Sequence, residues 1–129
     1  NYFLRFPRQA MSGCVLRDPT GRTRGFAVLN LLPRPKSRIV VGKVVDCLLD
    51  APDPDLWHAA FVALSRELAR QGADVAEAYS GPPWTTDALR AAGYVHRHPL
   101  DVHLRDPNHL IPRDRPFHFT PIEGDYAYT

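Results

Sequence analysis

The segment IVVGKVVDCLLDAPDPDLWHAAFVALSRELARQGADVAEAY, residues 39–79, decides the fold of this chain. Residues 39–49 are rich in valine, isoleucine and leucine without clean alternation with polar residues, which is typical of a strand covered on both faces. Residues 74–79 predict a second strand, and the segment between predicts a helix. A strand, a helix and a second strand predict a right-handed parallel crossover, and hence a mixed α/β (α+β) fold.

The predicted helix carries signals at both of its ends. Asp53 can cap it, Pro54 suits its first position, and Asp55 complements the positive end of the helix dipole. Gly72 suits the left-handed conformation that often follows a helix C-terminus. Apolar residues recur at helical spacing, and they are Leu56, Ala60, Leu64 and Leu68.

Upstream of this unit, the sequence predicts a β-hairpin. A short apolar run at residues 14–17 ends in the turn DPTG, residues 18–21, and a β-rich run resumes at residues 24–32. Residues 33–36 contain two prolines and are expected to break this strand. The three strands that precede the helix are therefore expected to be antiparallel.

Downstream, residues 84–92 predict a short helix that Gly93 ends. Residues 94–97 and 100–104 are expected to form a closing hairpin around a proline, and residues 106–129 a tail over the surface. The length of 129 residues predicts a single domain over residues 1–129, and the ordered look of its first residues suggests a longer protein trimmed at the N-terminus.

Composition excludes several classes of function. A net charge of +2 without blocks of like charge, and without aromatic residues interleaved among the cations, gives no platform for nucleic acid. No run approaches the roughly 20 apolar residues of a membrane span. Cys14 and Cys47 lie in separate apolar runs, as expected of buried thiols in the cytoplasm. Histidines 96, 98 and 103 lack a nearby cysteine, so no metal site is predicted.

Three segments carry a resemblance to a known family: RGFAV at residues 24–28, VVDCLL at 44–49 and ALRAAGY at 88–94. With the order of elements, they resemble the C-terminal two-thirds of GNAT-type N-acyltransferases, and most closely the divergent GNAT-like proteins linked to bacterial polysaccharide biosynthesis. The resemblance implies a mainly antiparallel sheet with one parallel β-α-β crossover. It also implies that the strands matching residues 39–49 and 74–79 splay apart, so that the pantetheine arm of acetyl-CoA enters between them.

The resemblance implies roles for individual residues. Asp46 interrupts an apolar strand where the family often supplies a general base, although it could instead accept hydrogen bonds from a loop or pair with an arginine. Tyr79 is the candidate acid that protonates the departing thiolate, because the family's usual tyrosine position holds Leu89, and Tyr94 is a second possibility. The predicted acetyl-CoA contacts are Cys47, Leu48, Leu49, Asp55 and Leu56.

One departure from the family leaves an alternative function open. The loop DAPDPD, residues 50–55, has no glycine, loses two N–H donors to proline and places three carboxylates where a diphosphate would bind. The first hypothesis is an acyl-CoA-dependent N-acyltransferase acting on a small-molecule amine or amino sugar. The alternative is a non-catalytic binding or assembly module with a degenerate acyl-CoA site, and open sheet edges would also favour pairing into a homodimer.

Overall fold

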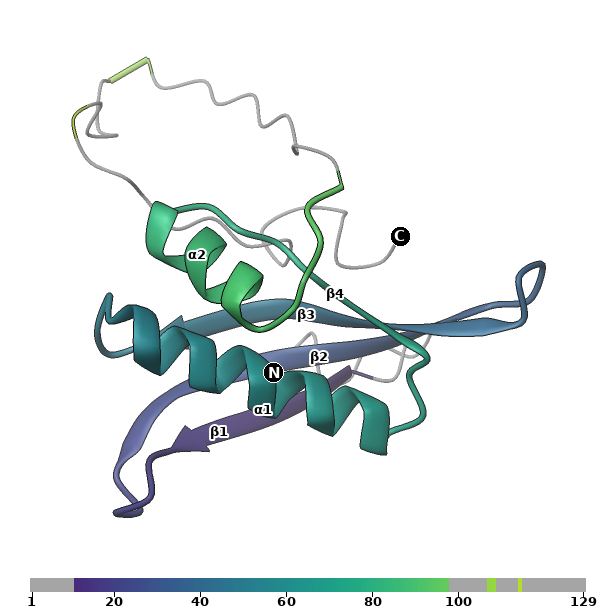
Figure 1. Cartoon of the computed structure of the whole chain (residues 1–129), viewed down its shortest axis with the longest axis horizontal. Helices are drawn as coiled ribbons and strands as arrows, with labels where there is room; N and C mark the ends of the chain where they lie inside the picture. The colour runs from purple at the N-terminus through teal and green to yellow at the C-terminus, as the bar shows by residue number, and fades with distance from the viewer. Residues whose placement is uncertain (1–10, 98–106, 109–113, 115–129) are drawn as a thin grey trace.

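The computed structural model describes residues 11–97 together with residues 107, 108 and 114. Within this part of the chain, four strands form one sheet in the order β1-β2-β3-β4 (Figure 1). They are β1 (Met11–Arg17), β2 (Thr23–Arg34), β3 (Ile39–Leu49) and β4 (Val75–Ala78). β1, β2 and β3 pair antiparallel, whereas β3 and β4 pair parallel. The predicted mixed, mainly antiparallel sheet with one parallel crossover is therefore confirmed.

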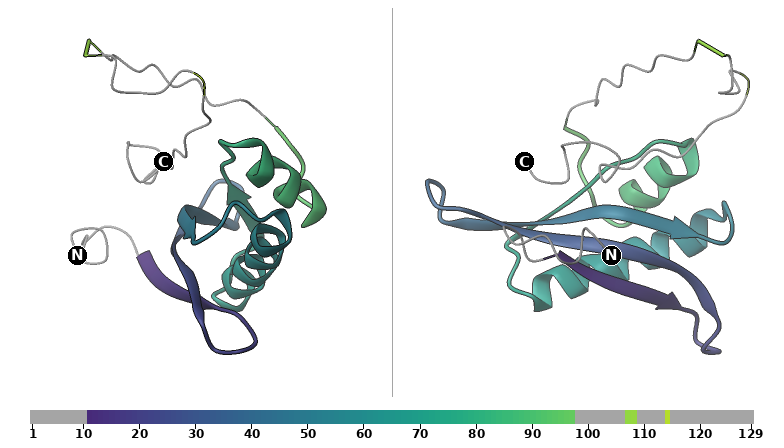
Figure 2. Two further views of the ribbon diagram at one scale, coloured as in Figure 1. Left: turned by 90° about the vertical axis from the view of Figure 1, so that its left-hand side faces the viewer. Right: turned by 180° about the vertical axis from the view of Figure 1, so that it is seen from behind.

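The two helices among the described residues cover one face of this sheet, as the side view in Figure 2 shows. α1 (Pro54–Arg70) links β3 to β4, and α2 (Pro83–Ala91) follows β4 and packs against α1. The face of the sheet away from α1 is called the open face below. Neither described helix combines the length and the apolar character needed to cross a membrane. The buried side chains of α1 are Trp57, Ala60, Phe61, Leu64 and Leu68.

The predicted boundaries of α1 are confirmed in atomic detail. Asp53 has an extended backbone, and its carboxylate accepts a hydrogen bond from the amide of Asp55. Gly72 adopts φ +97°, and the next amide, that of Ala73, donates to the carbonyl of Leu68. Both ends of α1 thus satisfy groups that a helix leaves without intrahelical partners.

α1 approaches the sheet closely at Gly42. A Cβ atom at this position would lie 2.8 Å from the Cβ of Ala73 and 2.8 Å from Leu68 Cδ2, so only glycine fits without movement. Further along β3, side chains of Val44, Cys47 and Leu49 enter the same core beneath α1. Burying Val44 and Leu49 contributes about 1.5–3 kcal/mol for each side chain, which favours the docking of the strand against the helix.

Two expectations about strand boundaries are wrong. β2 does not break at Pro33, which pairs with Val40. The amide and the carbonyl of Val40 both hydrogen-bond to Asp74, so Pro33 and Val40 form a non-hydrogen-bonded pair, and the missing N–H of Pro33 removes no bond between β2 and β3. Residues 94–97 form no strand, and at their start the amide of Tyr94 donates to the carbonyl of Leu89 and so closes the end of α2. The partner strand at residues 100–104 lies outside the described residues, as does nearly all of the tail.

Candidate functional site

β3 and β4 diverge part of the way along their length. Their parallel pairing begins at Val41 opposite Val75 and ends at Val44 opposite Ala78, although β3 continues to Leu49. Figure 1 shows β4 turning away toward α2 while β3 runs on along the sheet. The splay that the family resemblance implied is therefore present between these two strands.

A β-bulge in β3 coincides with the start of the splay. Val28 of β2 pairs with Asp46, whereas the next residue of β2, Leu29, pairs with Val44. Val45 is the extra residue of the bulge, and its side chain is fully buried. A bulge bends a strand and increases its twist, which accounts for the divergence of β3 from β4 at this point.

The backbone of β3 beyond the bulge presents polar groups to the splay. The amide of Asp50 donates to the carbonyl of Arg24 at 2.8 Å, so Asp50 turns its polar groups toward β2. Because these groups alternate along an antiparallel strand, Leu48 also turns its N–H and C=O toward β2. Leu49 and Cys47 direct their N–H and C=O groups toward the opposite edge of β3, where β4 no longer pairs with it. Of the predicted backbone contacts, Leu49 and Cys47 thus face the splay and Leu48 does not.

The side chains of the same segment divide between the two faces of the sheet. Cys47 and Leu49 enter the core under α1, so Asp46 belongs to the open face, where it is half-buried. Burial, with a smaller effect of the Asp46 charge, raises the pKa of the Cys47 thiol to about 12, which makes it a poor nucleophile. Within residues 11–97, no hydrogen bond or ion pair engages the Asp46 carboxylate.

Tyr79 follows directly after β4, at the point where the two strands part. Its hydroxyl donates a hydrogen bond to Glu77 Oε1 at 2.9 Å. Glu77 pairs in register with Lys43 of β3, whose Nζ lies 4.0 Å from the same carboxylate oxygen and 6.0 Å from the centre of the Tyr79 ring. The structure therefore places both predicted catalytic residues, Asp46 and Tyr79, on the open face, on opposite sides of the splay.

Lys43 and Glu77 were not predicted as site residues. The side chain of Lys43 is only 3% exposed, and burial lowers its pKa, an effect that Glu77 opposes and Arg34 reinforces. The sequence did hold a signal, because Lys43 interrupts an otherwise apolar strand. A buried lysine requires a polar partner, and Glu77 is the acidic residue of the neighbouring strand.

Tyr94, the second tyrosine considered, belongs to the helix layer. Its hydroxyl lies 2.7 Å from Ser65 Oγ on α1, and burial raises its pKa although the hydrogen bond with Ser65 lowers it. Leu89 is buried in the core beneath α1. Neither residue reaches the face of the sheet that holds Asp46.

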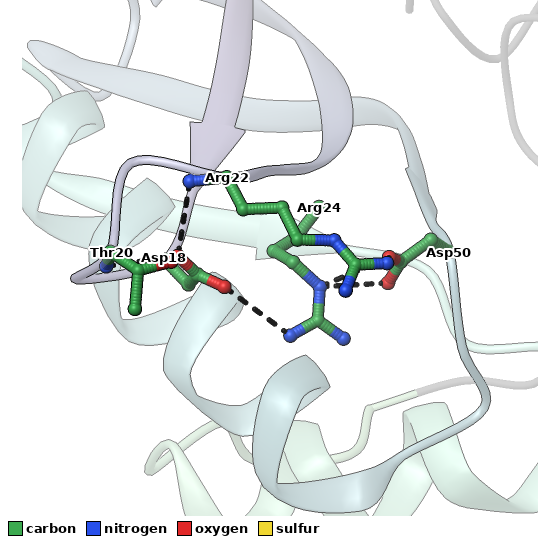
Figure 3. A network of polar contacts seen from close by, with 5 residues as sticks. All are labelled: Asp18, Thr20, Arg22, Arg24 and Asp50. Atoms are coloured by element: carbon green, nitrogen blue, oxygen red, sulfur yellow. Dashed lines mark hydrogen bonds and ion pairs between the residues drawn. The ribbon is translucent and has the colours of Figure 1, made fainter.

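The loop after β3 is held by charges from the β1–β2 hairpin, as Figure 3 shows. Arg24 Nε lies 3.0 Å from Asp50 Oδ1, and Arg22 lies 3.5 Å from the other oxygen of the same carboxylate. Arg24 also contacts Asp18, whose carboxylate accepts hydrogen bonds from Thr20 and Arg22 that lower its pKa. Asp50 is thus already neutralised by arginines on the hairpin side.

The first turn of α1 has few backbone donors to spare. Pro54 has no N–H, the amide of Asp55 donates to the side chain of Asp53, and that of Trp57 donates to the Asp53 carbonyl. Only the amide of Leu56 lacks an acceptor among the described residues. A helix N-terminus that binds a diphosphate needs several free amides, so the predicted contacts Asp55 and Leu56 offer little to that end of a coenzyme.

A cavity of about 440 Å³ lies along the outer edge of β4. Its apolar walls come from β3, β4 and α2, and Arg90, His96 and Arg97 add positive or titratable groups. Among the described residues, no group of three potential ligands is arranged to hold a metal ion.

Comparisons with solved structures identify the fold. A protein of Thermus thermophilus aligns with 73% of this chain and 69% of its own, at 14% identity and a TM-score of 0.55. A Trypanosoma brucei acetyltransferase covers the same shares at 20% identity and a TM-score of 0.53. The ribosomal-protein-alanine N-acetyltransferase of Brucella melitensis biovar Abortus 2308 covers 81% and 76% at 17% identity and a TM-score of 0.53. No protein-family model and no curated protein sequence matches the chain. This likeness shows the fold, which is that of GNAT-type acetyltransferases.

Proposed function

We propose that this chain is an acyl-CoA-dependent N-acyltransferase that binds the pantetheine arm of its donor between β3 and β4. One observation carries the proposal: the parallel pairing of these strands stops at Val44 and Ala78, beside the bulge at Val45. Beyond this point Leu49 directs its N–H and C=O toward the splay, at the edge of β3 that β4 has left. An extended pantetheine arm, which contains two amides, can pair with such a strand edge as another strand would.

The residues around the splay have separate roles in the proposed acyl transfer. Asp46 takes a proton from the acceptor amine as it attacks the thioester carbonyl, and Tyr79 gives its proton to the departing sulfur. Backbone amides of β3 bind the donor and polarise the carbonyl. Asp46 and Tyr79 would approach the reacting atoms from the two sides of the splay, which suits one base and one acid acting on the same thioester.

The acceptor that we propose is an amine on a small molecule such as an amino sugar, in a route to a bacterial polysaccharide. We place the reaction in the cytoplasm. The two cysteines support this placement, because Cys14 and Cys47 are both free thiols.

Release of free thiol from acetyl-CoA in the presence of a panel of amines and amino sugars tests the proposal. We expect Asp46→Asn to lower kcat by about 10²–10⁴-fold with donor affinity unchanged, because a positioned base contributes that much. The matched control is Asp87→Asn, which removes an exposed carboxylate of α2. An active wild type whose Asp46→Asn variant retains full kcat would contradict the role of Asp46.

A second candidate function is a non-catalytic binding or assembly module. The capped first turn of α1 favours it, because Asp53 already occupies the amide of Asp55, and two further carboxylates lie in the same loop. Failure of acetyl-CoA to stabilise the chain against heat, at millimolar donor, would favour this alternative.

A further inference from the structure

Three polar residues meet where β3 and β4 part. Lys43 and Glu77 are the register pair next to Val44 and Ala78, the last pair before the splay. Glu77 Oε1 accepts the Tyr79 hydroxyl at 2.9 Å and lies 4.0 Å from Lys43 Nζ. Lys43 is enclosed, with its side chain 3% exposed, whereas that of Glu77 is 41% exposed. The carboxylate therefore joins a buried cation to a tyrosine at the start of the splay.

We propose that Glu77 and Lys43 are positioning residues for Tyr79: Glu77 orients its hydroxyl and keeps it protonated, and Lys43 holds Glu77 in place. The inference rests on the proposed function, in which Tyr79 is the acid. It adds two residues on adjacent strands that act on the reaction through Tyr79 without touching the donor.

Tyr79 can act as the acid only if its hydroxyl is still protonated when the thiolate departs. As the C–N bond forms and the C–S bond breaks, sulfur takes the Tyr79 proton and Asp46 takes one from the amine nitrogen. Water then returns a proton to Tyr79 and accepts one from Asp46, so no oxidant or reductant is needed. A carboxylate 2.9 Å from the phenol oxygen opposes early ionisation, because two negative charges would face each other.

Lys43 has the opposite effect on the ionisation of the Tyr79 hydroxyl. Its ammonium lies 6.0 Å from the ring centre and favours the phenolate that forms as the proton leaves. Burial lowers the pKa of Lys43 and Glu77 opposes that shift, so the carboxylate helps the lysine to keep its charge. Other charged groups near this cluster are Arg34 and Asp46 on the sheet, and Arg90, His96 and Arg97 along the cavity that Glu77 also lines.

The test uses the full chain labelled with ¹³C in its tyrosine rings and titrated without any donor. Tyr79→Phe identifies the signal of Tyr79. We expect Glu77→Gln to lower the pH at which Tyr79 ionises by about one pH unit, because it removes a negative charge beside the phenol. Lys43→Met should raise that pH, because it removes a positive charge. Asp87→Asn is the control and should leave the signal unchanged. Absence of a shift in Glu77→Gln, or shifts of the same sign in both variants, would overturn the inference.

A second readout uses acyl transfer from acetyl-CoA. In Glu77→Gln the basic limb of the kcat profile should move to lower pH, with kcat about tenfold lower and the KM for acetyl-CoA unchanged. Met fills the space of the buried lysine, and a thermal scan verifies that Lys43→Met is folded. An active wild type whose Glu77→Gln variant keeps the wild-type profile overturns this inference alone. A wild type that neither binds nor uses acetyl-CoA overturns the proposed function, and with it the role of Tyr79 as acid.

Discussion

Asp53 Oδ1 accepts a hydrogen bond from the amide of Asp55 at 3.0 Å and so closes the N-terminus of α1. Replacing Asp53 with alanine should lower the free energy of unfolding by about 1 kcal/mol, because an orphan helix donor loses its acceptor. Asn retains a side-chain oxygen, so Asp53→Asn should remain close to the wild type. Urea denaturation of the three proteins measures this difference, and equal losses for alanine and asparagine would show that the cap is not the cause.

The closed helix end also predicts which part of the donor is recognised. Since the amide of Asp55 is occupied and Asp50 belongs to the Arg24 ion pair, the diphosphate of a coenzyme finds little to bind. We expect S-acetyl-pantetheine, which lacks the nucleotide, to bind within about tenfold of acetyl-CoA, a difference of about 1.4 kcal/mol. Isothermal titration with both compounds measures the ratio. Acetyl-CoA binding that is tighter by several orders of magnitude would show that the nucleotide end has a site.

Local signals in the sequence account for the parts of the fold that were predicted correctly. Asp53, Pro54 and Gly72 specify the ends of α1 through interactions within a few residues, and they are independent of the rest of the chain. Pro33 was misjudged because its effect depends on whether it falls at a hydrogen-bonded position of the β2–β3 ladder. That depends on the register with Val40, whose polar groups bind Asp74, and no signal near Pro33 records it.

The candidate site was predictable only in outline. The sequence marked Asp46 as a polar residue in an apolar strand, and the resemblance implied the splay. The bulge at Val45 was missed, because it reflects the register between β2 and β3 in a run of apolar residues that fits either register. The contact of Glu77 with Lys43 was missed for a similar reason, since it depends on the parallel register of β3 with β4.

Gly25 is predicted to be essential for the pairing of β2 with β3. A Cβ atom there would overlap the backbone carbonyl oxygen of Leu48, which cannot move without shifting the strand. Gly25→Ala should therefore destabilise the chain by more than Gly42→Ala, for which we expect about 1–3 kcal/mol, because the atoms nearest to Gly42 belong to the side chains of Leu68 and Ala73 and not to the backbone. Thermal unfolding of both variants tests the order, and a smaller loss at Gly25 would contradict the close approach.

The buried thiol of Cys47 is expected to make the folded chain less stable at high pH. Burial raises the pKa of its thiol to about 12 in the folded chain, from 9.0. Between these values the unfolded chain loses this proton while the folded chain keeps it, so the free energy of unfolding falls as the pH rises from 9 toward 12. Cys47→Ala should show a shallower decline over the same range. Identical slopes for the two proteins in urea denaturation at several pH values would refute the assignment.

The most direct test of the account is to follow the backbone amide of Leu49 by ¹⁵N NMR while acetyl-CoA is added to the full chain. If the splay between β3 and β4 receives the pantetheine arm, the Leu49 signal shifts saturably, together with signals on the facing side of β4. Unchanged Leu49 and β4 signals at millimolar acetyl-CoA would contradict the central claim, and the chain would then be a GNAT-shaped binding module.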